Sequence, residues 1–182
     1  METTELVIPE PPLELLDEKY LEYLDGQWVK KESVGREKHE DATQVVYNLL
    51  NRYRPLVGGK VAQHWTIILG PDKAEPDVTL SHPVYNTHQG YLVSPAFLVV
   101  EVRSYGQTLS YLVDKCKNRY HRAGIPYCWI VDADTHTGYE CHREGPHPQQ
   151  VEALTAGPII KLQLPKSSKK PQNFKLLHAD SA

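Results

Sequence analysis

The sequence has few of the features that mark secreted, membrane and strongly basic proteins. It contains only three cysteines, without paired spacing, and no signal peptide precedes them, so we expect a cytosolic protein in a reducing setting. No apolar run approaches the ~18 residues that a membrane-spanning helix needs. The formal net charge of -3 gives no overall attraction to nucleic acid, so any DNA binding must come from a local basic patch.

The length of 182 residues is enough for one domain with a hydrophobic core and short tails. Residues 1–12 are acidic and proline-rich, which predicts a flexible N-terminal arm. The domain itself is expected over residues 13–164. Residues 165–182 are rich in Lys, Ser, Pro and Gln, a composition typical of a mobile tail.

The hydrophobic pattern predicts a mixture of helices and short strands. Apolar residues at helical spacing predict helices over residues 13–24, with acids on the outer face, and over residues 37–54. Asp25-Gly26 marks a turn after the first of these. Short strands are predicted over residues 27–31, 60–63, 65–69, 77–80, 139–142, 151–154 and 159–164. This order favours an α/β protein, or an α+β protein with a mixed sheet.

The stretch over residues 96–132 organises the rest of the chain. Residues 97–102 and 127–131 are almost wholly apolar, which is typical of strands covered on both faces. A polar loop and a helix over residues 109–123 connect them. Together they predict a βαβ unit, for which a right-handed crossover is the default.

Two acids stand beside predicted strands. Asp77 opens one short strand, and Glu101 ends a buried strand 24 residues later. If these strands are adjacent, the carboxylates meet, and their repulsion calls for a proton or a cation between them. Oxygen ligands favour Mg²⁺ or Mn²⁺. The alternative is that Asp77 caps a turn and Glu101 pairs with a surface lysine.

Basic residues gather on the predicted crossover helix. At 100° per residue, Arg119 and Arg122 share one flank with Lys115, while Lys117 lies on the other flank. Such a ridge suits phosphate oxygens. The alternative is that bases near the C-terminus of a helix only complement its dipole.

Several of these segments together resemble a known family. They are Pro76-Asp77, the run LVVEVRS that contains Glu101, GQT before the helix, a helix lysine, AGIP, and WIVD ending at Asp132. The combination resembles the putative restriction-endonuclease family of the PD-(D/E)xK nuclease superfamily, over about residues 20–164. The resemblance implies a restriction-endonuclease-like core with flanking helices.

The resemblance also implies roles for individual residues. Asp77 and Glu101 would hold the catalytic metal ion, Mg²⁺ or Mn²⁺. The sequence has Arg103 where the motif has its lysine, and in this family the lysine lies on the following helix. Counting forward from Gly106 gives Lys115.

Other positions stay open under the same resemblance. In the family, the lysine and the aromatic residue that follows it are separated by one residue fewer than Lys115 and Tyr120 are here. Applied backwards from Tyr120, the family spacing gives Cys116, so Lys117 is kept as a second candidate. Glu40 is a further possible catalytic acid. The residues expected to bind flanking phosphates are Arg103, Arg119 and Arg122.

Two functions are consistent with these observations. The first is a metal-dependent endonuclease that hydrolyses phosphodiester bonds in DNA, most simply as a cytosolic homodimer. The second is a module that keeps the fold without catalysis and serves nucleic-acid binding or protein assembly. A component of a larger mobile-element or defence system, active only with a partner, is a third possibility.

Overall fold

The computed structural model describes residues 8–18, 20–31, 37–57, 59–81, 84, 86, 90–93, 96–135, 137–142, 149–151, 159–160 and 174–175. Most of the arm and tail expected at the two ends of the chain lies outside the described residues. No helix in the described ranges combines the length and the apolar character needed to cross a membrane.

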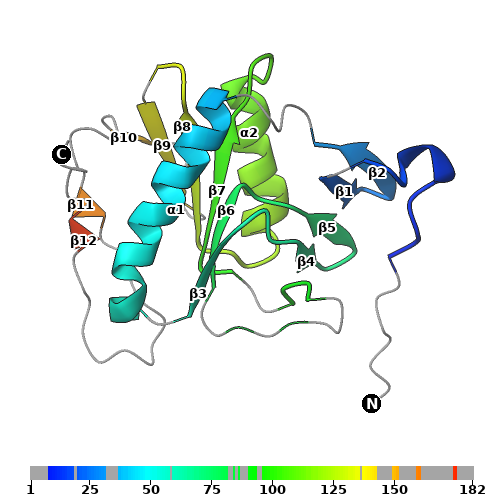
Figure 1. The fold of residues 1–182 in the computed structure, drawn as a ribbon, viewed down its shortest axis with the longest axis horizontal. Helices are drawn as coiled ribbons and strands as arrows, with labels where there is room; N and C mark the ends of the chain where they lie inside the picture. The colour runs from blue at the N-terminus through cyan, green and yellow to red at the C-terminus, as the bar shows by residue number, and fades with distance from the viewer. Residues whose placement is uncertain are drawn as a thin grey trace.

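A six-stranded mixed sheet forms the centre of the fold (Figure 1). Its strands, in spatial order, are β10 (Gln149–Val151), β9 (Thr137–His142), β8 (Tyr127–Asp132), β7 (Leu98–Arg103), β6 (Val78–Ser81) and β3 (Lys60–Gln63). β7 and β8 are parallel, and the other neighbours are antiparallel. The prediction of an α/β or α+β chain with a mixed sheet is confirmed.

Helices cover both faces of this sheet (Figure 1). The long helix α1 (Glu37–Val57) packs Val46 and Leu50 against the face that carries Val100. On the other face, α2 (Leu109–Lys115) continues directly into a π-helical segment, η2 (Cys116–His121). Because side chains alternate along a strand, successive residues of β7 pack against the helices on opposite faces of the sheet.

A smaller four-stranded sheet packs beside α2 and η2. Its order is β2 (Gln27–Lys30), β1 (Leu21–Leu24), β5 (Asp72–Ala74) and β4 (Ile67–Leu69). Leu24, Ile67 and Ala74 of this sheet share one core with Leu112 and Tyr120. Three short elements complete the described chain: η1 (Leu13–Leu15), β11 (Ile159–Ile160) and β12 (Phe174–Lys175).

The prediction of a helix over residues 13–24 is wrong. Only Leu13–Leu15 forms a single 3₁₀ turn, and β1 follows. Asp25 and Gly26 have φ angles of 50° and 79°, which close a two-residue hairpin with Leu24 opposite Gln27. A turn with two positive φ angles is a strong local signal for a hairpin, and here it outweighs a short helical periodicity.

Candidate active site

Asp77 and Glu101 lie beside each other on neighbouring strands. β6 and β7 run antiparallel with Val78 opposite Val100, and Asp77 precedes Val78 while Glu101 follows Val100. The next step of the same register therefore brings the two acids together. Both residues are buried, with Asp77 0% and Glu101 2% exposed.

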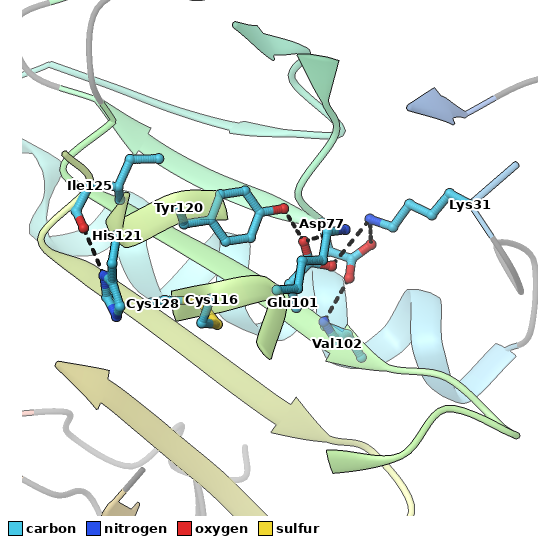
Figure 2. Close-up of a disulfide and its surroundings, with 10 residues drawn as sticks. Lys31, Asp77, Glu101, Val102, Cys116, Tyr120, His121, Ile125 and Cys128 are labelled. Atoms are coloured by element: carbon cyan, nitrogen blue, oxygen red, sulfur yellow. Dashed lines mark hydrogen bonds and ion pairs between the residues drawn. A yellow bond between two sulfur atoms is a disulfide. The ribbon is translucent and has the colours of Figure 1, made fainter. Parts of the chain in front are cut away.

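An ammonium group lies between these two carboxylates. Lys31, directly after β2, donates a 2.7 Å hydrogen bond to Asp77 Oδ1, and its Nζ lies 3.6 Å from Glu101 Oε2 (Figure 2). It also donates a 2.6 Å hydrogen bond to the carbonyl oxygen of Glu75. The two acids thus converge on one positive charge.

Lys115 reaches the same cluster from the end of α2. Its Nζ lies 3.0 Å from Glu101 Oε1 and 3.0 Å from each carboxylate oxygen of Glu22. Glu22 lies on β1 and also accepts a 2.9 Å hydrogen bond from the backbone N–H of Glu75. The site therefore contains a third buried acid.

Sequence reasoning missed Glu22 because the expected helix over residues 13–24 placed it among outward-facing acids. In the observed hairpin it is buried, only 3% exposed. The signal that could have found it is the Asp25-Gly26 pair, since Asp-Gly is a preferred sequence for the two-residue turn of a hairpin and so favours a strand on either side. Lys31, at the end of the second strand of the same hairpin, was missed for a different reason, because no local pattern marks a lysine that turns inward.

The π-helical segment explains how Lys115 and Tyr120 both face the site. The two residues are five positions apart, a spacing that a regular α-helix of 3.6 residues per turn would place on different faces. A π-helix has i→i+5 hydrogen bonds, so one of its turns holds about one residue more than an α-helical turn. The wider turn of η2 brings residues five positions apart closer to one face, and both side chains contact Glu101.

Further hydrogen bonds fix the carboxylates. The hydroxyl group of Tyr120 donates to Glu101 Oε1 (Figure 2). The backbone N–H of Val102 donates a 2.6 Å hydrogen bond to Asp77 Oδ2, and His39 Nε2 of α1 lies 3.5 Å from the same oxygen. Both acids are therefore held in one orientation by groups from three elements.

The charges in the cluster stabilise one another. Burial alone would raise the pKa of Asp77, but the Lys31 ammonium and the hydrogen bond from His39 lower it well below its usual range. Burial also opposes the charged forms of Lys31 and Lys115, yet the surrounding carboxylates raise the pKa of both groups. The pKa of Glu22 is lowered in spite of burial, chiefly by Lys115. At neutral pH the site holds ionised groups of both signs.

Two other candidate residues lie at the margin of the cluster. Glu40 Oε1 is 3.8 Å from His39 Nδ1, and His39 in turn reaches Asp77. Glu40 therefore stands one residue away from the paired acids. Arg103 donates a 2.7 Å hydrogen bond to Asp132 Oδ2 at the ends of the two parallel strands.

The predicted basic ridge on the crossover helix is divided. Arg119 donates hydrogen bonds of 2.6 Å to Asp25 and 2.9 Å to Asp72, and with Arg122 it lines a separate cavity of about 650 Å³. Lys117 is exposed. The predicted common flank of Lys115, Arg119 and Arg122 assumed the i, i+4 spacing of an α-helix, which the π-helical turn removes. Of the basic residues on this helix, only Lys115 enters the acidic cluster.

A cleft leads from the surface to the two lysines of the cluster. Its volume is about 320 Å³. The residues that line it are Glu22, Val29, Lys30, Lys31, Gly106, Gln107, Thr108, Tyr111 and Lys115. Basic and hydrogen-bonding groups thus surround the opening, which suits an anionic ligand.

Two cysteines are paired, contrary to the expectation of reduced thiols. Cys116 of η2 and Cys128 of β8 form a disulfide, and both are 0% exposed (Figure 2). Cys141 remains a buried thiol, and burial raises its pKa to about 11. The pairing has no sequence signature, because the partners come from a helix and the strand beneath it and meet only through packing.

The carboxylates of the cluster are candidate ligands for a divalent cation. Among the described residues, no group of three or more His, Cys, Asp or Glu side chains has the arrangement of a metal site. Mg²⁺ commonly binds one or two carboxylates and completes its shell with water and substrate phosphates. Asp77 and Glu101, which already converge on the Lys31 ammonium, fit this binding mode with two carboxylates.

Comparisons with known proteins agree with this fold. A family model described as "Uma2: Putative restriction endonuclease" matches residues 11–167. The crystal structure of a putative nuclease of DUF820 from Anabaena variabilis superposes with a TM-score of 0.62 at 13% sequence identity. The match covers 86% of this chain and 87% of that chain, and at this identity it shows a shared fold. No curated protein matches the chain.

Proposed function

The chain belongs to the Uma2 family of putative restriction endonucleases, and from this premise we propose that it is a metal-dependent endonuclease that hydrolyses phosphodiester bonds in DNA. The observation that carries the proposal is the convergence of Asp77 and Glu101 on one cation, with the Lys115 ammonium 3.0 Å from Glu101. The cluster brings buried carboxylates from separate strands together, and like charges this close repel one another unless a cation lies between them.

Asp77 and Glu101 are the residues that would hold Mg²⁺ or Mn²⁺. When bound there, such an ion would supply a water of lowered pKa and positive charge towards a reacting phosphate. Tyr120 and the Val102 N–H fix the directions of the two carboxylates. Preset ligands lose little conformational freedom on binding, which favours affinity.

Lys115 is the residue proposed to contact the attacked phosphate or the attacking water. It lines the cleft and carries a full positive charge that Glu22 and Glu101 stabilise. Glu22 is a positioning residue in this scheme, because both of its oxygens hold the Lys115 ammonium. Lys117 is absent from the described residues that line the cleft, so it serves as a matched control for Lys115.

The direct test is cleavage of supercoiled plasmid with Mg²⁺ or Mn²⁺. We expect wild type and Lys117→Met to cut, and Asp77→Asn and Glu101→Gln to lose about 10²-fold or more, because a metal ligand contributes several kcal/mol to transition-state stabilisation. Circular dichroism checks that each variant is folded. Equal cutting by all four proteins would remove the assignment.

The second candidate is a module with the nuclease fold that binds nucleic acid or another protein without cutting. It is favoured by one observation: the Lys31 ammonium already neutralises the acids that a metal would need. Titration calorimetry with Mn²⁺ separates the two. No heat of Mn²⁺ binding to wild type, together with retained DNA affinity, would support the module.

The remaining proposals concern setting and assembly. DNA is the proposed substrate, the cytosol the proposed location, and a homodimer the proposed state, since PD-(D/E)xK nucleases commonly pair to cut two strands. Sedimentation velocity tests the dimer. A single monomeric species at all concentrations, with undiminished cleavage of both strands, would contradict it.

A further inference from the structure

Lys31 occupies the position that the two acids leave for a cation. Its ammonium contacts Asp77 Oδ1 at 2.7 Å and Glu101 Oε2 at 3.6 Å, and its side chain is 6% exposed. Lys115, the other buried lysine of the cluster, reaches Glu101 from a different element, α2. Lys31 is therefore a second buried ammonium group at the same acids, and the proposed mechanism does not use it.

The ammonium group and a divalent ion are alternatives at this place. Both would need the facing oxygens of the same two carboxylates, and like charges a few ångströms apart in a buried site repel strongly. Two buried carboxylate groups also cannot lose a counter-charge that they share without cost. The metal-free arrangement is thus stable because of Lys31, and a metal can enter only as Lys31 leaves.

The surroundings of Lys31 allow it to leave. The residue directly follows β2, an edge strand of the small sheet with mostly exposed side chains. Lys31 also lines the cleft of about 320 Å³, so rotation of its side chain can carry the ammonium towards solvent. The backbone stays tied to the hairpin through the hydrogen bond from the Lys31 N–H to the Tyr20 carbonyl oxygen.

We propose that Lys31 is a tethered cation that holds the Asp77–Glu101 site in the metal-free protein and is displaced when a divalent ion binds. The inference rests on the proposed function, since it concerns the same site. It assigns Lys31 a role as competitor of the metal, distinct from the role of Lys115. The released ammonium remains beside the cleft in which an anionic substrate would bind.

The first experiment measures Mn²⁺ affinity by calorimetry for wild type and three variants. We expect Lys31→Met to bind Mn²⁺ about tenfold or more tightly than wild type, because the site no longer has to expel an ammonium group. Lys30→Met is the control, since Lys30 is the neighbouring residue and its side chain is 56% exposed. Asp77→Asn should lose binding.

The second experiment uses the wild-type chain, so it holds even if Lys31→Met fails to fold. An amine-reactive acetylating reagent and mass spectrometry give the labelling rate of each lysine. We expect Mn²⁺ to increase the rate at Lys31 several-fold and to leave Lys30 unchanged. An unchanged or slower rate at Lys31 in saturating Mn²⁺ would overturn the proposal.

The outcomes separate this inference from the proposed function. If Lys31→Met binds Mn²⁺ no more tightly than wild type while Asp77→Asn loses binding, the metal site stands and the competing role of Lys31 falls. If neither wild type nor Lys31→Met binds Mn²⁺, both ideas fail together. Binding by both proteins, with Lys31→Met the tighter, would support both ideas. Binding by Lys31→Met alone would show that a metal does not displace the wild-type ammonium group, and it would overturn the proposal.

Discussion

At the scale of single residues, burial separates groups that act together from groups that only share a helix. Lys115 and Lys117 are two positions apart, yet one is buried among carboxylates and the other is exposed. Glu22 and Glu101 both depend on the Lys115 ammonium for their counter-charge. An exposed ion pair would contribute little to the free energy of unfolding, whereas a buried charged group left without its partner lowers it strongly.

Replacing Lys115 with Met should therefore lower the free energy of unfolding by about 3–5 kcal/mol, because two buried carboxylates lose their counter-charge. Lys117→Met should change it by less than about 0.5 kcal/mol, as is usual for a surface substitution. Urea unfolding at neutral pH measures both. Equal small losses would mean that the cluster is more hydrated than its burial indicates.

Glu75 gives a pH-dependent prediction. Burial raises the pKa of its side chain from the ordinary 4.5 to about 7, with Lys31 opposing and Glu22 adding to the shift. The folded state then binds a proton that the unfolded state has released, so this group's contribution to stability falls as pH rises from 4.5 through 7. Glu75→Gln should be more stable than wild type at pH 8, by about 1–3 kcal/mol.

The measurement is urea unfolding of both proteins at pH 4 and pH 8. The difference between them should be small at pH 4, where the Glu75 carboxyl is protonated in the folded state. Titration of other groups affects both proteins alike and cancels in the comparison. A difference that is the same at both pH values would show that the effect comes from packing.

At the scale of elements, the π-helical turn directs two side chains five positions apart, those of Lys115 and Tyr120, to the same carboxylate. η2 begins immediately after Lys115 and contains Tyr120. Its adjustment is local, because α2 before it is regular and Thr108 caps the helix start by accepting a hydrogen bond from the Tyr111 N–H. The site depends on this one turn for the relative directions of its lysine and tyrosine.

Deleting Asn118, an exposed residue of η2, should let the segment close as an ordinary α-helix. We expect a folded protein that loses about 1–3 kcal/mol of stability, in the range of common substitutions. Deleting Asp114, an exposed residue of α2 before the lysine, should fail to give a folded protein, because it rotates Lys115 away from Glu22. Thermal unfolding followed by circular dichroism tells the two apart.

The disulfide between η2 and β8 should stabilise this same segment. Its cysteines are 12 residues apart, and a loop of about this length corresponds to ~3 kcal/mol in the chain-entropy model. Unfolding in urea with and without reductant should show a loss of that order. Thiol titration of denatured protein should give one free thiol without reductant, and three free thiols there would refute the pairing.

At the scale of the whole molecule, binding of a metal to the folded state alone should raise stability. At a free Mn²⁺ concentration 100 times the dissociation constant, the free energy of unfolding should rise by about 2.7 kcal/mol. Asp77→Asn should show no such increase, because it lacks one of the two proposed ligands. An equal increase in both proteins would place the binding elsewhere.

The sequence predicted the central βαβ unit well, because its strands are covered on both faces and are apolar at nearly every position. It also selected Asp77 and Glu101, whose contact follows from the pairing of two adjacent strands. Glu22 and Lys31 were not predicted, since they enter through a hairpin whose docking depends on tertiary packing. The same reason accounts for the unforeseen disulfide.

The acidic cluster draws its members from two sheets and a helix. Glu22 and Lys31 come from the small sheet and its edge, and they meet Lys115 and Asp77 across 93 and 46 residues of chain. The large sheet contributes the carboxylates of Asp77 and Glu101, and their counter-charges come from Lys31 and Lys115 on other elements. A chain whose hairpin has not docked consequently lacks Glu22 and Lys31 at this cleft, so the cluster is assembled only late, when distant parts of the chain have come together.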